Sequence, residues 1–490
     1  MGDFMDSRSS FSQAGGLAPQ DGLAFSALRA LWRDAGLPAA ALDNVVLSGQ
    51  DPVLPSSFAV GTAAQVSIAA AGLAAAELWH LRGQPRQQVA VDMLHAAQEC
   101  RSYFTINGVM PDQWDKISGA YACGDGGWVR IHAKFAHHRD GALALLGCPT
   151  GERATRADVA QALQRWKALE FEQVAADAGL VVAAMRRFDE WDAHPQAAAL
   201  ADQPLVSIER IGDADPRPLP AHADVLARPL QGVRVLDLTR IIAGPIGGRT
   251  LAAHGADVML VNSPHLPNID NIIETSQGKL SVHADLETAD GRIALGNLLR
   301  SAQVFVQGYR PGGMEALGFG AQEAARIRPG IVYVSLSAYG ARGPWANRRG
   351  FDSLVQTATG FNHAEALAAG QAEPKPLPVQ ILDYASGFLM AFGAQAALLR
   401  QATEGGSWQV RVSLARTALW LRSLGRVDDG LNCPMPAVDD LLDTTETGFG
   451  TLSAVRHAAR LSATPAVWVR PSAPPGTHPT VWPFQGTLAG

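Results

Sequence analysis

The chain has 490 residues, of which 47% are apolar and 18% are charged, and its formal net charge is -6. This composition excludes wholesale disorder and suits a globular protein whose large core is divided among two or three domains. Because no basic block interrupts the acidic balance, we expect neither nucleic acid nor a membrane as a partner.

The start of the chain is not expected to be a signal peptide. Residues 1–20 lack the basic and apolar regions of a signal peptide and are predicted to form a flexible leader. The apolar segment 63–81 is rich in alanine and ends in Glu77 and His80, which favours a buried core helix over a membrane span. The cysteines lie far apart and match no metal or redox spacing. We therefore expect a cytoplasmic protein with reduced thiols and no metal.

Residues 21–211 show a less regular pattern than the rest of the chain. Amphipathic helices are predicted at 165–179 and 186–201, and a strand is predicted at 126–135 beside a glycine turn. The stretch 212–229 is rich in Pro, Ala and Asp and is predicted to be a linker.

From residue 230 onward, short β-branched runs alternate with helical segments. The four predicted strands are 232–238, 256–262, 303–309 and 330–340. Helices are predicted between them, including 285–302 and 314–328. Strand and helix alternating at this spacing predict an α/β fold with a parallel, doubly wound sheet in residues 230–425.

Two distant segments resemble each other without a gap. Residues 72–98 and 393–419 share a glycine, an Ala-Ala pair, a leucine and a Gln-Val-x-Val run, and both predict helix, turn and strand. The similarity is explained either by duplication or by chance between alanine-rich helices. If it is duplication, Thr62 occupies the position that matches Asp383.

Asp383 stands between an apolar run and a small-residue helix start, in VQILDYASG. A carboxylate there is either a helix cap or a reactive group. At a helix start, the helix dipole favours the ionised form. With an ordinary pKa near ~3.9, Asp383 is expected to be ionised at neutral pH.

Residues 229–425 resemble the class III CoA-transferases. The matching runs, in order, are PLQGVRVLDLTRIIAGPIGGRTLAAHGADVMLV, GKLSVHADLETADGR, VFVQGYRPGGMEALGFG, GIVYVSLSAYGARGPWANRRGFDSLVQTATG and VQILDYASGFLMAFGAQAALL. The resemblance implies a Rossmann-like CoA-binding domain, a smaller α+β domain and an interlocked homodimer. Residues 21–211 resemble the second half of the family, so the usual order is rearranged. Residues 426–490 resemble an abbreviated ending that returns to the large domain.

The resemblance also implies a reaction and its residues. Asp383 matches the family's nucleophile, which exchanges CoA between an acyl-CoA and a carboxylic acid through a mixed anhydride and an aspartyl-CoA thioester. Gly387 is expected to offer a backbone N–H to an oxyanion. Coenzyme A enters as a substrate. The residues expected to contact it are Ile241, Ile242, Ala243, Lys279, Tyr309, Arg310 and Arg349.

Several positions depart from the family pattern, and they keep other interpretations open. Ile242 replaces a frequent glutamine, Gly308 a frequent asparagine, Ala316 a frequent arginine and Asn262 the usual glutamate. A CoA-binding pseudoenzyme therefore remains a second interpretation. An acyl-CoA racemase is a third, but Phe351 stands where the related racemase has a histidine, and phenylalanine cannot move a proton.

Overall fold

The structure is a computed structural model that describes residues 22–112, 114–219 and 228–483. The predicted leader at 1–20 lies outside the described residues, as do residues 220–227 of the predicted linker.

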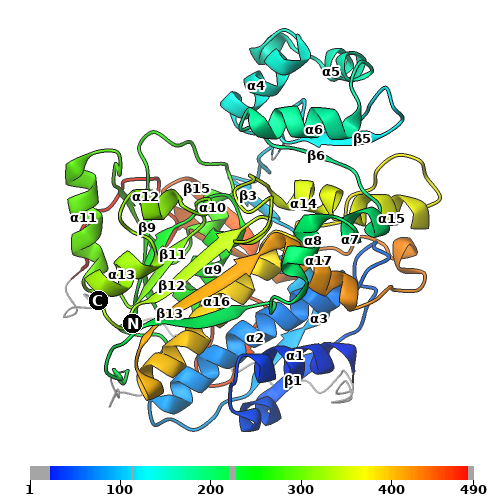
Figure 1. Ribbon diagram of the computed structural model, residues 1–490. Helices are drawn as coiled ribbons and strands as arrows, with labels where there is room; N and C mark the ends of the chain where they lie inside the picture. Colours follow the sequence, from blue (N-terminus) through cyan, green and yellow to red (C-terminus); the bar gives the residue numbers. More distant parts are fainter. Residues whose placement is uncertain (1–21, 113, 220–227, 484–490) are drawn as a thin grey trace.

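A seven-stranded sheet forms the centre of the molecule (Figure 1). Its strands in spatial order are β10 (Lys279–His283), β9 (Asp257–Asn262), β8 (Arg234–Leu238), β11 (Val304–Gln307), β12 (Val332–Ser337), β13 (Ser407–Ser413) and β7 (Ser207–Gly212). The first six are parallel, and β8 lies in the middle with later strands added on both sides. This order confirms the predicted doubly wound α/β fold. The antiparallel edge strand β7 was not predicted.

Helices cover both faces of this sheet. The helices that lie against its faces are α9 (Ala243–Ala253) and α16 (Ile381–Glu404) on one side, and α11 (Ala289–Leu299) and α13 (Ala321–Ile327) on the other. The single helix predicted at 314–328 is wrong. Gly318 has a φ of 80°, which ends α12 (Gly313–Ala316) before α13 begins.

The N-terminal segment adds a second long helix to the core. Helix α2 (Val60–Leu81) packs along α16, and both are buried despite being long and apolar enough to span a bilayer by composition. A short strand and helix follow each of them in the chain. These followers are β2 (Val89–Asp92) and α3 (Met93–Glu99) after α2, and β13 and α17 (Leu414–Ser423) after α16. The two similar segments therefore share one local architecture.

A separate small domain stands above the large one in Figure 1. Its antiparallel sheet has the order β4 (Gly119–Ala122), β5 (Trp128–Ile131) and β6 (Val182–Ala184). Helices α4 (Ala136–Leu146), α5 (Arg156–Leu163) and α6 (Ala168–Asp177) cover one face and share a hydrophobic core with it. The other face is turned toward α14 (Asp352–Ala358) of the large domain.

The end of the chain pairs with its N-terminal segment. Strands β14 (Leu442–Thr447) and β15 (Gly450–Val455) form a sheet with β3 (Phe104–Ile106). Farther on, Arg470 forms an ion pair of 2.8 Å with Asp257 at the start of β9. The C-terminal segment therefore contacts both the N-terminal segment and the large domain.

Candidate active site

The two central strands of the sheet, β8 and β11, mark its switch point. Beyond them the connections turn to opposite sides, and ligands of such sheets bind at the carboxyl ends of these strands. The loop after β8 contains Ile241, whose φ of 78° is strained for a β-branched residue. Ile242 and Ala243 begin α9 and are buried, so only Ile241 of these three predicted contacts is partly exposed.

Asp383 is the third residue of α16, in the first helical turn. The residue that precedes the helix as its N-cap is Gln380, so the interpretation of Asp383 as a plain N-cap is wrong. Its backbone N–H donates a hydrogen bond of 2.9 Å to Oδ2 of Asp352. The first turn of α16 is thus capped by a carboxylate from another helix, and the Asp383 side chain is left for another role.

Asp352 begins α14 and is fully buried. Besides the Asp383 N–H, its carboxylate accepts a hydrogen bond from the Gln356 side-chain amide. Burial raises the pKa of Asp352 to about 7, against the opposing effect of these hydrogen bonds and of the Arg130 charge. Hydrogen bonds from N–H groups favour the charged form, so the negative charge of the pair is better accommodated on Asp352 than on Asp383.

The carboxyl group of Asp383 has no such compensation. Burial, and then the neighbouring charge of Asp352, raise the pKa of Asp383 well above its usual value. The expectation of an ordinary, ionised aspartate is therefore wrong, because nothing in the local pattern indicates that a second carboxylate lies beside Asp383. Two acids this close resist carrying two charges at neutral pH, and their titration is shared.

Gly387 lies too far into α16 for the predicted oxyanion role. It is the seventh residue of the helix, beyond the first turn whose N–H groups lack helical acceptors. A Cβ atom there would lie 2.4 Å from the carbonyl oxygen of Ala243 and 2.8 Å from Cβ of Ile246. Glycine is therefore needed at this position for the close packing of α16 on α9.

Positive charge gathers around the predicted CoA residues Tyr309, Arg310 and Arg349. Arg310 acts on Arg349 through charge, and Arg349 Nη1 lies 3.0 Å from Nε2 of His138 in the small domain. Arg240, which the sequence did not single out, lies near Tyr309. No arginine of this cluster pairs with a carboxylate among residues 22–112, 114–219 and 228–483. Such unpaired cations form the electrostatic pattern of an anion site.

Lys279 does not belong to that cluster. Its Nζ forms an ion pair of 2.8 Å with Asp237 and donates a second hydrogen bond of 2.8 Å to the carbonyl of Pro245. The side chain is completely buried beneath α9. The predicted contact with CoA is therefore wrong for Lys279, whose charge stabilises the start of α9 against β8.

Two residues of the small domain complete the surroundings of the carboxylate pair. Arg130 lies near enough to Asp352 for each charge to shift the other's pKa. The ring of His132 stacks on Phe351 with centroids 4.0 Å apart. The sequence did not single them out because they lie more than 200 residues before Asp352. The signal was present, however, since two polar side chains alternate with apolar ones in the predicted strand.

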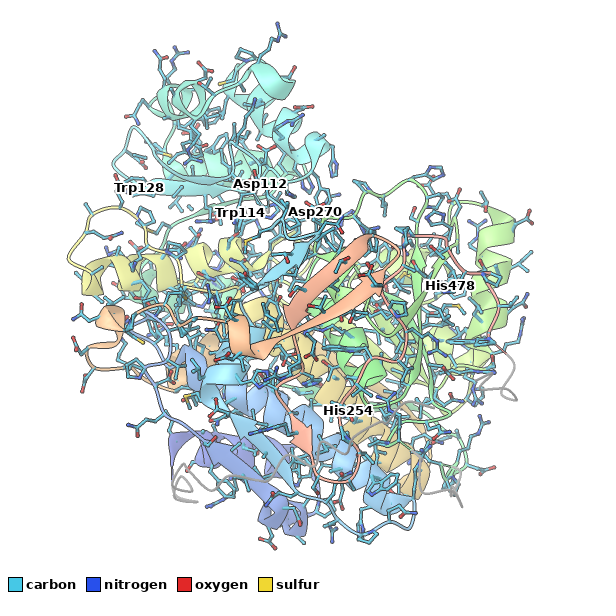
Figure 2. The ribbon with its side chains drawn as sticks, turned by 180° about the vertical axis from the view of Figure 1, so that it is seen from behind. Asp112, Trp114, Trp128, His254, Asp270 and His478 are labelled. Carbon is cyan, nitrogen blue, oxygen red and sulfur yellow. The ribbon has the colours of Figure 1, made fainter. Side chains whose placement is uncertain are left out.

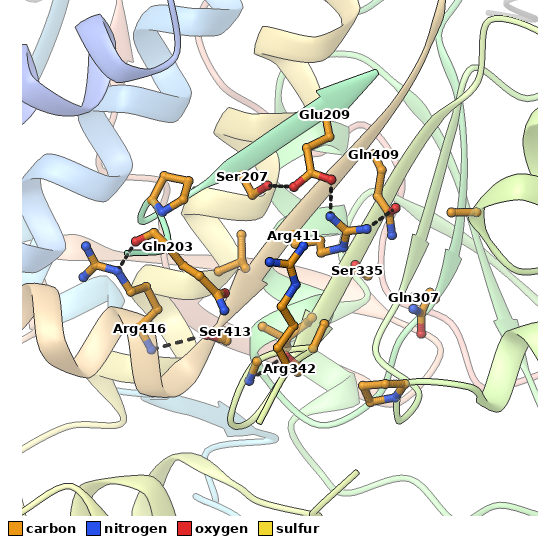
Figure 3. A pocket seen from close by; sticks show the side chains of 18 of the residues that line it. Gln203, Ser207, Glu209, Gln307, Ser335, Arg342, Gln409, Arg411, Ser413 and Arg416 are labelled. Atoms are coloured by element: carbon orange, nitrogen blue, oxygen red, sulfur yellow. Dashed lines mark hydrogen bonds and ion pairs between the residues drawn. The ribbon is translucent and has the colours of Figure 1, made fainter. Parts of the chain in front are cut away.

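A large cavity lies elsewhere on the sheet (Figure 3). Its volume is about 710 Å³, and polar side chains of β11, β12, β13 and β7 line its floor. Several of them already pair with one another, such as Arg411 with Glu209 at 2.6 Å. Tyr309 borders the cavity but Asp383 does not. The cavity therefore adjoins the arginine cluster without including the carboxylate pair.

Comparison with known proteins gives a consistent family. Residues 230–437 match the family model of CoA-transferase family III. An acyl-CoA transferase of Gibberella moniliformis is 29% identical over 418 residues, which cover 76% of this chain and 73% of that protein. An acetyl-coenzyme A transferase of Hypoxylon pulicicidum is 36% identical over 41% of this chain and 35% of its own length. A probable fatty acyl-CoA transferase of Mycobacterium tuberculosis is 32% identical, with coverages of 40% and 53%.

The extent of these matches differs between the relatives. The chain spans about three quarters of the Gibberella protein, but only about a third to a half of the other two. The Gibberella match reaches well beyond residues 230–437. That relative therefore also resembles this chain outside the sheet domain.

Proposed function

Because the chain belongs to CoA-transferase family III, a family of enzymes that transfer CoA, we propose that it exchanges CoA between an acyl-CoA thioester and a carboxylic acid. The observation that carries this proposal is the position of Asp383. Its carboxyl group lies in the first turn of a buried helix, inside the segment that matches the family model. It does not cap that helix, because Asp352 accepts the N–H of the first turn.

The proposed reaction begins with attack of the Asp383 carboxylate on the thioester carbonyl. The carbon–sulfur bond breaks, CoA leaves as a thiolate, and the acyl group is held as a mixed anhydride. The thiolate then attacks the aspartyl carbonyl and releases the donor acid, which leaves an aspartyl-CoA thioester. The acceptor carboxylate attacks this thioester, which releases CoA thiolate again and forms a second anhydride, between Asp383 and the acceptor acid. The thiolate then attacks the acceptor carbonyl of that anhydride and forms the new acyl-CoA. Asp383 is regenerated as a carboxylate.

The arginine cluster is proposed to hold the phosphates of CoA. Arg240 follows β8 and acts on Tyr309 through charge, whereas Arg310 follows β11 and acts on Arg349. The Tyr309 ring is proposed as the surface on which adenine stacks. Gly308 leaves room there, since a Cβ atom would meet nothing nearer than 3.9 Å.

The carboxylate pair sets a condition on the first step. Attack needs the charge on Asp383, whereas the hydrogen bonds to Asp352 favour the charge on Asp352. We propose that productive binding places the thioester carbonyl beside Asp383. The free-energy cost of ionising Asp383 next to a charged Asp352 is then offset by formation of the bond to the carbonyl carbon. Asp352 then acts as a positioning residue that fixes the first turn of α16.

The experiment for this proposal is intact-protein mass spectrometry after brief mixing with a panel of acyl-CoAs. Wild-type protein is expected to gain an acyl or CoA adduct that hydroxylamine removes. Asp383→Asn is expected to gain none, while the matched variant Asp352→Asn keeps the adduct, since Asp352 is not the nucleophile. Absence of any adduct, with CoA still stabilising the fold, would favour a CoA-binding pseudoenzyme.

A second candidate is proton transfer next to the thioester, and one observation favours it. His132 brings an imidazole to 4.0 Å from Phe351, the position at which the related racemase has its histidine. Burial lowers the pKa of His132 to about 3, so the imidazole is neutral at pH 7 but only a weak base, which makes this function the less favoured of the two. Exchange of the α-hydrogen with deuterated water, without any covalent adduct, would support this function instead of CoA transfer.

A further inference from the structure

A second cavity lies beside the first turn of α2. Its volume is about 590 Å³, which is in the range of small-molecule sites. It is lined by residues of α1 (Leu23–Asp34), β1 (Val45–Ser48), α2 and the segment 426–428. Figure 2, like Figure 1, shows α1 and β1 at the end of the molecule opposite the small domain. Neither Asp383 nor an arginine of the cluster lines this cavity, so it is separate from the proposed CoA site.

The walls of this cavity are largely apolar. Four buried apolar side chains from α1, β1 and α3 line it: Phe25, Val45, Leu47 and Met93. Two exposed residues, Arg426 and Asp428, also line it, and their opposite charges favour neither anions nor cations. An alkyl chain in this cavity would remove apolar surface from water, both its own and that of the walls.

Asp51 adds a negative charge to the lining. Its carboxylate accepts the N–H of Gly61 at 3.0 Å, and the N–H and the hydroxyl of Thr62 at 2.8 and 2.7 Å. Burial raises the pKa of Asp51, and Asp51 forms no ion pair in the part of the chain that the structure describes. The full charge of a carboxylate exceeds the partial charge of about +0.5 at a helix N-terminus. The field beside Asp51 therefore favours a cationic ligand.

Gln65 adds an acceptor that lacks a donor. The side chain is fully buried, and its Nε2 donates to the carbonyl oxygens of Ser48 at 2.8 Å and Val91 at 2.9 Å. These two acceptors fix the orientation of the amide. The other amide atom, Oε1, has no hydrogen-bond partner among the described residues, and Gln65 lines the cavity one turn of α2 after Thr62. A donor from a ligand would satisfy this buried oxygen.

We propose that this cavity binds a primary alkylamine, with its ammonium group between Asp51 and Gln65. An ammonium group carries three donors, which suits an ionised carboxylate beside an unpartnered amide oxygen. The alkyl chain would lie against the apolar walls. A carboxylic acid or an acyl-CoA does not suit this cavity, because its anionic groups would meet the Asp51 charge. Such a site would be separate from CoA transfer and does not depend on it.

The test compares three probes that share a six-carbon chain, namely hexylamine, 1-hexanol and hexanoate. Near pH 7 they are a cation, a neutral molecule and an anion, and calorimetric titration of the full-length protein measures each affinity. Wild-type protein is expected to bind hexylamine about 10-fold more tightly than 1-hexanol, because hydrogen bonds between charged groups are the stronger kind. Hexanoate is expected not to bind at concentrations at which hexylamine saturates the site.

Asp51→Asn removes the charge but keeps an oxygen that accepts N–H groups from the first turn of α2. It should lower the hexylamine affinity about 10-fold, to that of 1-hexanol, and leave the 1-hexanol affinity unchanged. Asp383→Asn is the matched control, because it removes the carboxyl group at the start of α16, and it should leave hexylamine binding unchanged. Loss of hexylamine binding in Asp383→Asn would place the amine at the carboxylate pair and overturn the proposal.

Gln65→Met removes the unpartnered acceptor, so it should weaken hexylamine and 1-hexanol by a similar factor. Gln395→Met should weaken neither. Gln395 is also fully buried with an Oε1 that lacks a partner among the described residues, but it does not line this cavity. Equal weakening by the two substitutions would mean that Gln65 acts through the fold, and would contradict its assignment as a ligand contact.

Ala24→Trp tests the cavity without changing Asp51 or Gln65. Ala24 lies in the first turn of α1, is partly exposed and lines the cavity. An indole there should fill the space and abolish binding of hexylamine and 1-hexanol. The proposal is overturned if wild-type protein does not bind hexylamine, if it binds all three probes equally, or if hexylamine binding survives both Asp51→Asn and Ala24→Trp.

Discussion

The starts of α2 and α16 are nearly the same structure with opposite chemistry. Each helix follows a residue in an unusual conformation, Ala59 with φ -75° and ψ 59° and Gln380 with φ -78° and ψ 57°. A carboxylate from earlier in the chain then caps each first turn. Asp51 accepts the N–H of Thr62 at 2.8 Å, and Asp352 accepts that of Asp383 at 2.9 Å. With the matching strand and helix that follow, this correspondence supports duplication over chance.

The difference lies in the third helical residue. The Thr62 hydroxyl donates a further bond of 2.7 Å to Asp51, so that every polar group of this turn is satisfied. At the start of α16, by contrast, the Asp383 carboxyl group lies near the Asp352 carboxylate, whose charge raises the pKa of Asp383. Thr62 lines a cavity of about 590 Å³, but its side chain and that of Asp383 are both buried, at 3% and 6% exposed. The α2 copy has the arrangement that favours stability, and the α16 copy has the strained one expected of a functional site.

The largest predicted effect comes from the buried ion pairs that join the segment after α2 to helix α9, which packs against α16. Arg249 of α9 pairs with Glu99, which follows β2, at 2.9 Å and also with Glu274 of α10 (Ile272–Thr275). Arg249→Met leaves two buried carboxylates without their cation, which should cost about 3–5 kcal/mol of stability. Urea unfolding measures the loss. A change below about 1 kcal/mol would show that water or other groups compensate these acids.

The next prediction converts the α16 copy into the α2 arrangement. In Asp383→Thr the hydroxyl can donate to Asp352, so the like-charge contact is replaced by a hydrogen bond. The fold should gain on the order of 2–4 kcal/mol near pH 8. The raised pKa values of the pair mean that the folded wild type holds extra protons above pH 4 and loses stability as pH rises toward and past 7. The gain should therefore shrink toward zero near pH 4.

Unfolding at pH 4, 6 and 8 measures this gain. Thr62→Ser is a suitable control, because it keeps the hydroxyl that donates to Asp51. An equal gain at all three pH values would contradict the assignment of the effect to the carboxylate pair.

The smallest predicted effect concerns the pH at which Asp383 becomes reactive. In wild-type protein the rate of adduct formation should still be rising with pH above 7, because Asp352, with a pKa of about 7, loses its proton first and the pKa of Asp383 is raised well above its usual value. Asp352→Asn removes the neighbouring charge, so the midpoint of the pH profile should move to lower pH, while burial still keeps the pKa of Asp383 above its usual value. A midpoint that stays in place would mean that Asp352 does not influence the nucleophile.

The sequence predicted what depends on local pattern. Strand and helix alternation predicted the sheet, and the family motif predicted that Asp383 opens a helix. The sequence did not predict that Lys279 would form a buried ion pair with Asp237. A lysine at the start of a strand has the same local pattern whether its side chain faces solvent or a buried acid. Nor did the sequence predict the Arg130–Asp352 neighbourhood, which arises only when the small domain folds back onto α14.

The most direct test of the account is to locate the adduct within the chain. Protein mixed with succinyl-CoA would be digested, and the hydroxylamine-sensitive modification mapped to a peptide. The account predicts one modification per chain, on the peptide that contains Asp383, with none on the peptide that contains Thr62. A modification on any other residue, or none while CoA remains bound, would contradict the assignment of Asp383 as the nucleophile.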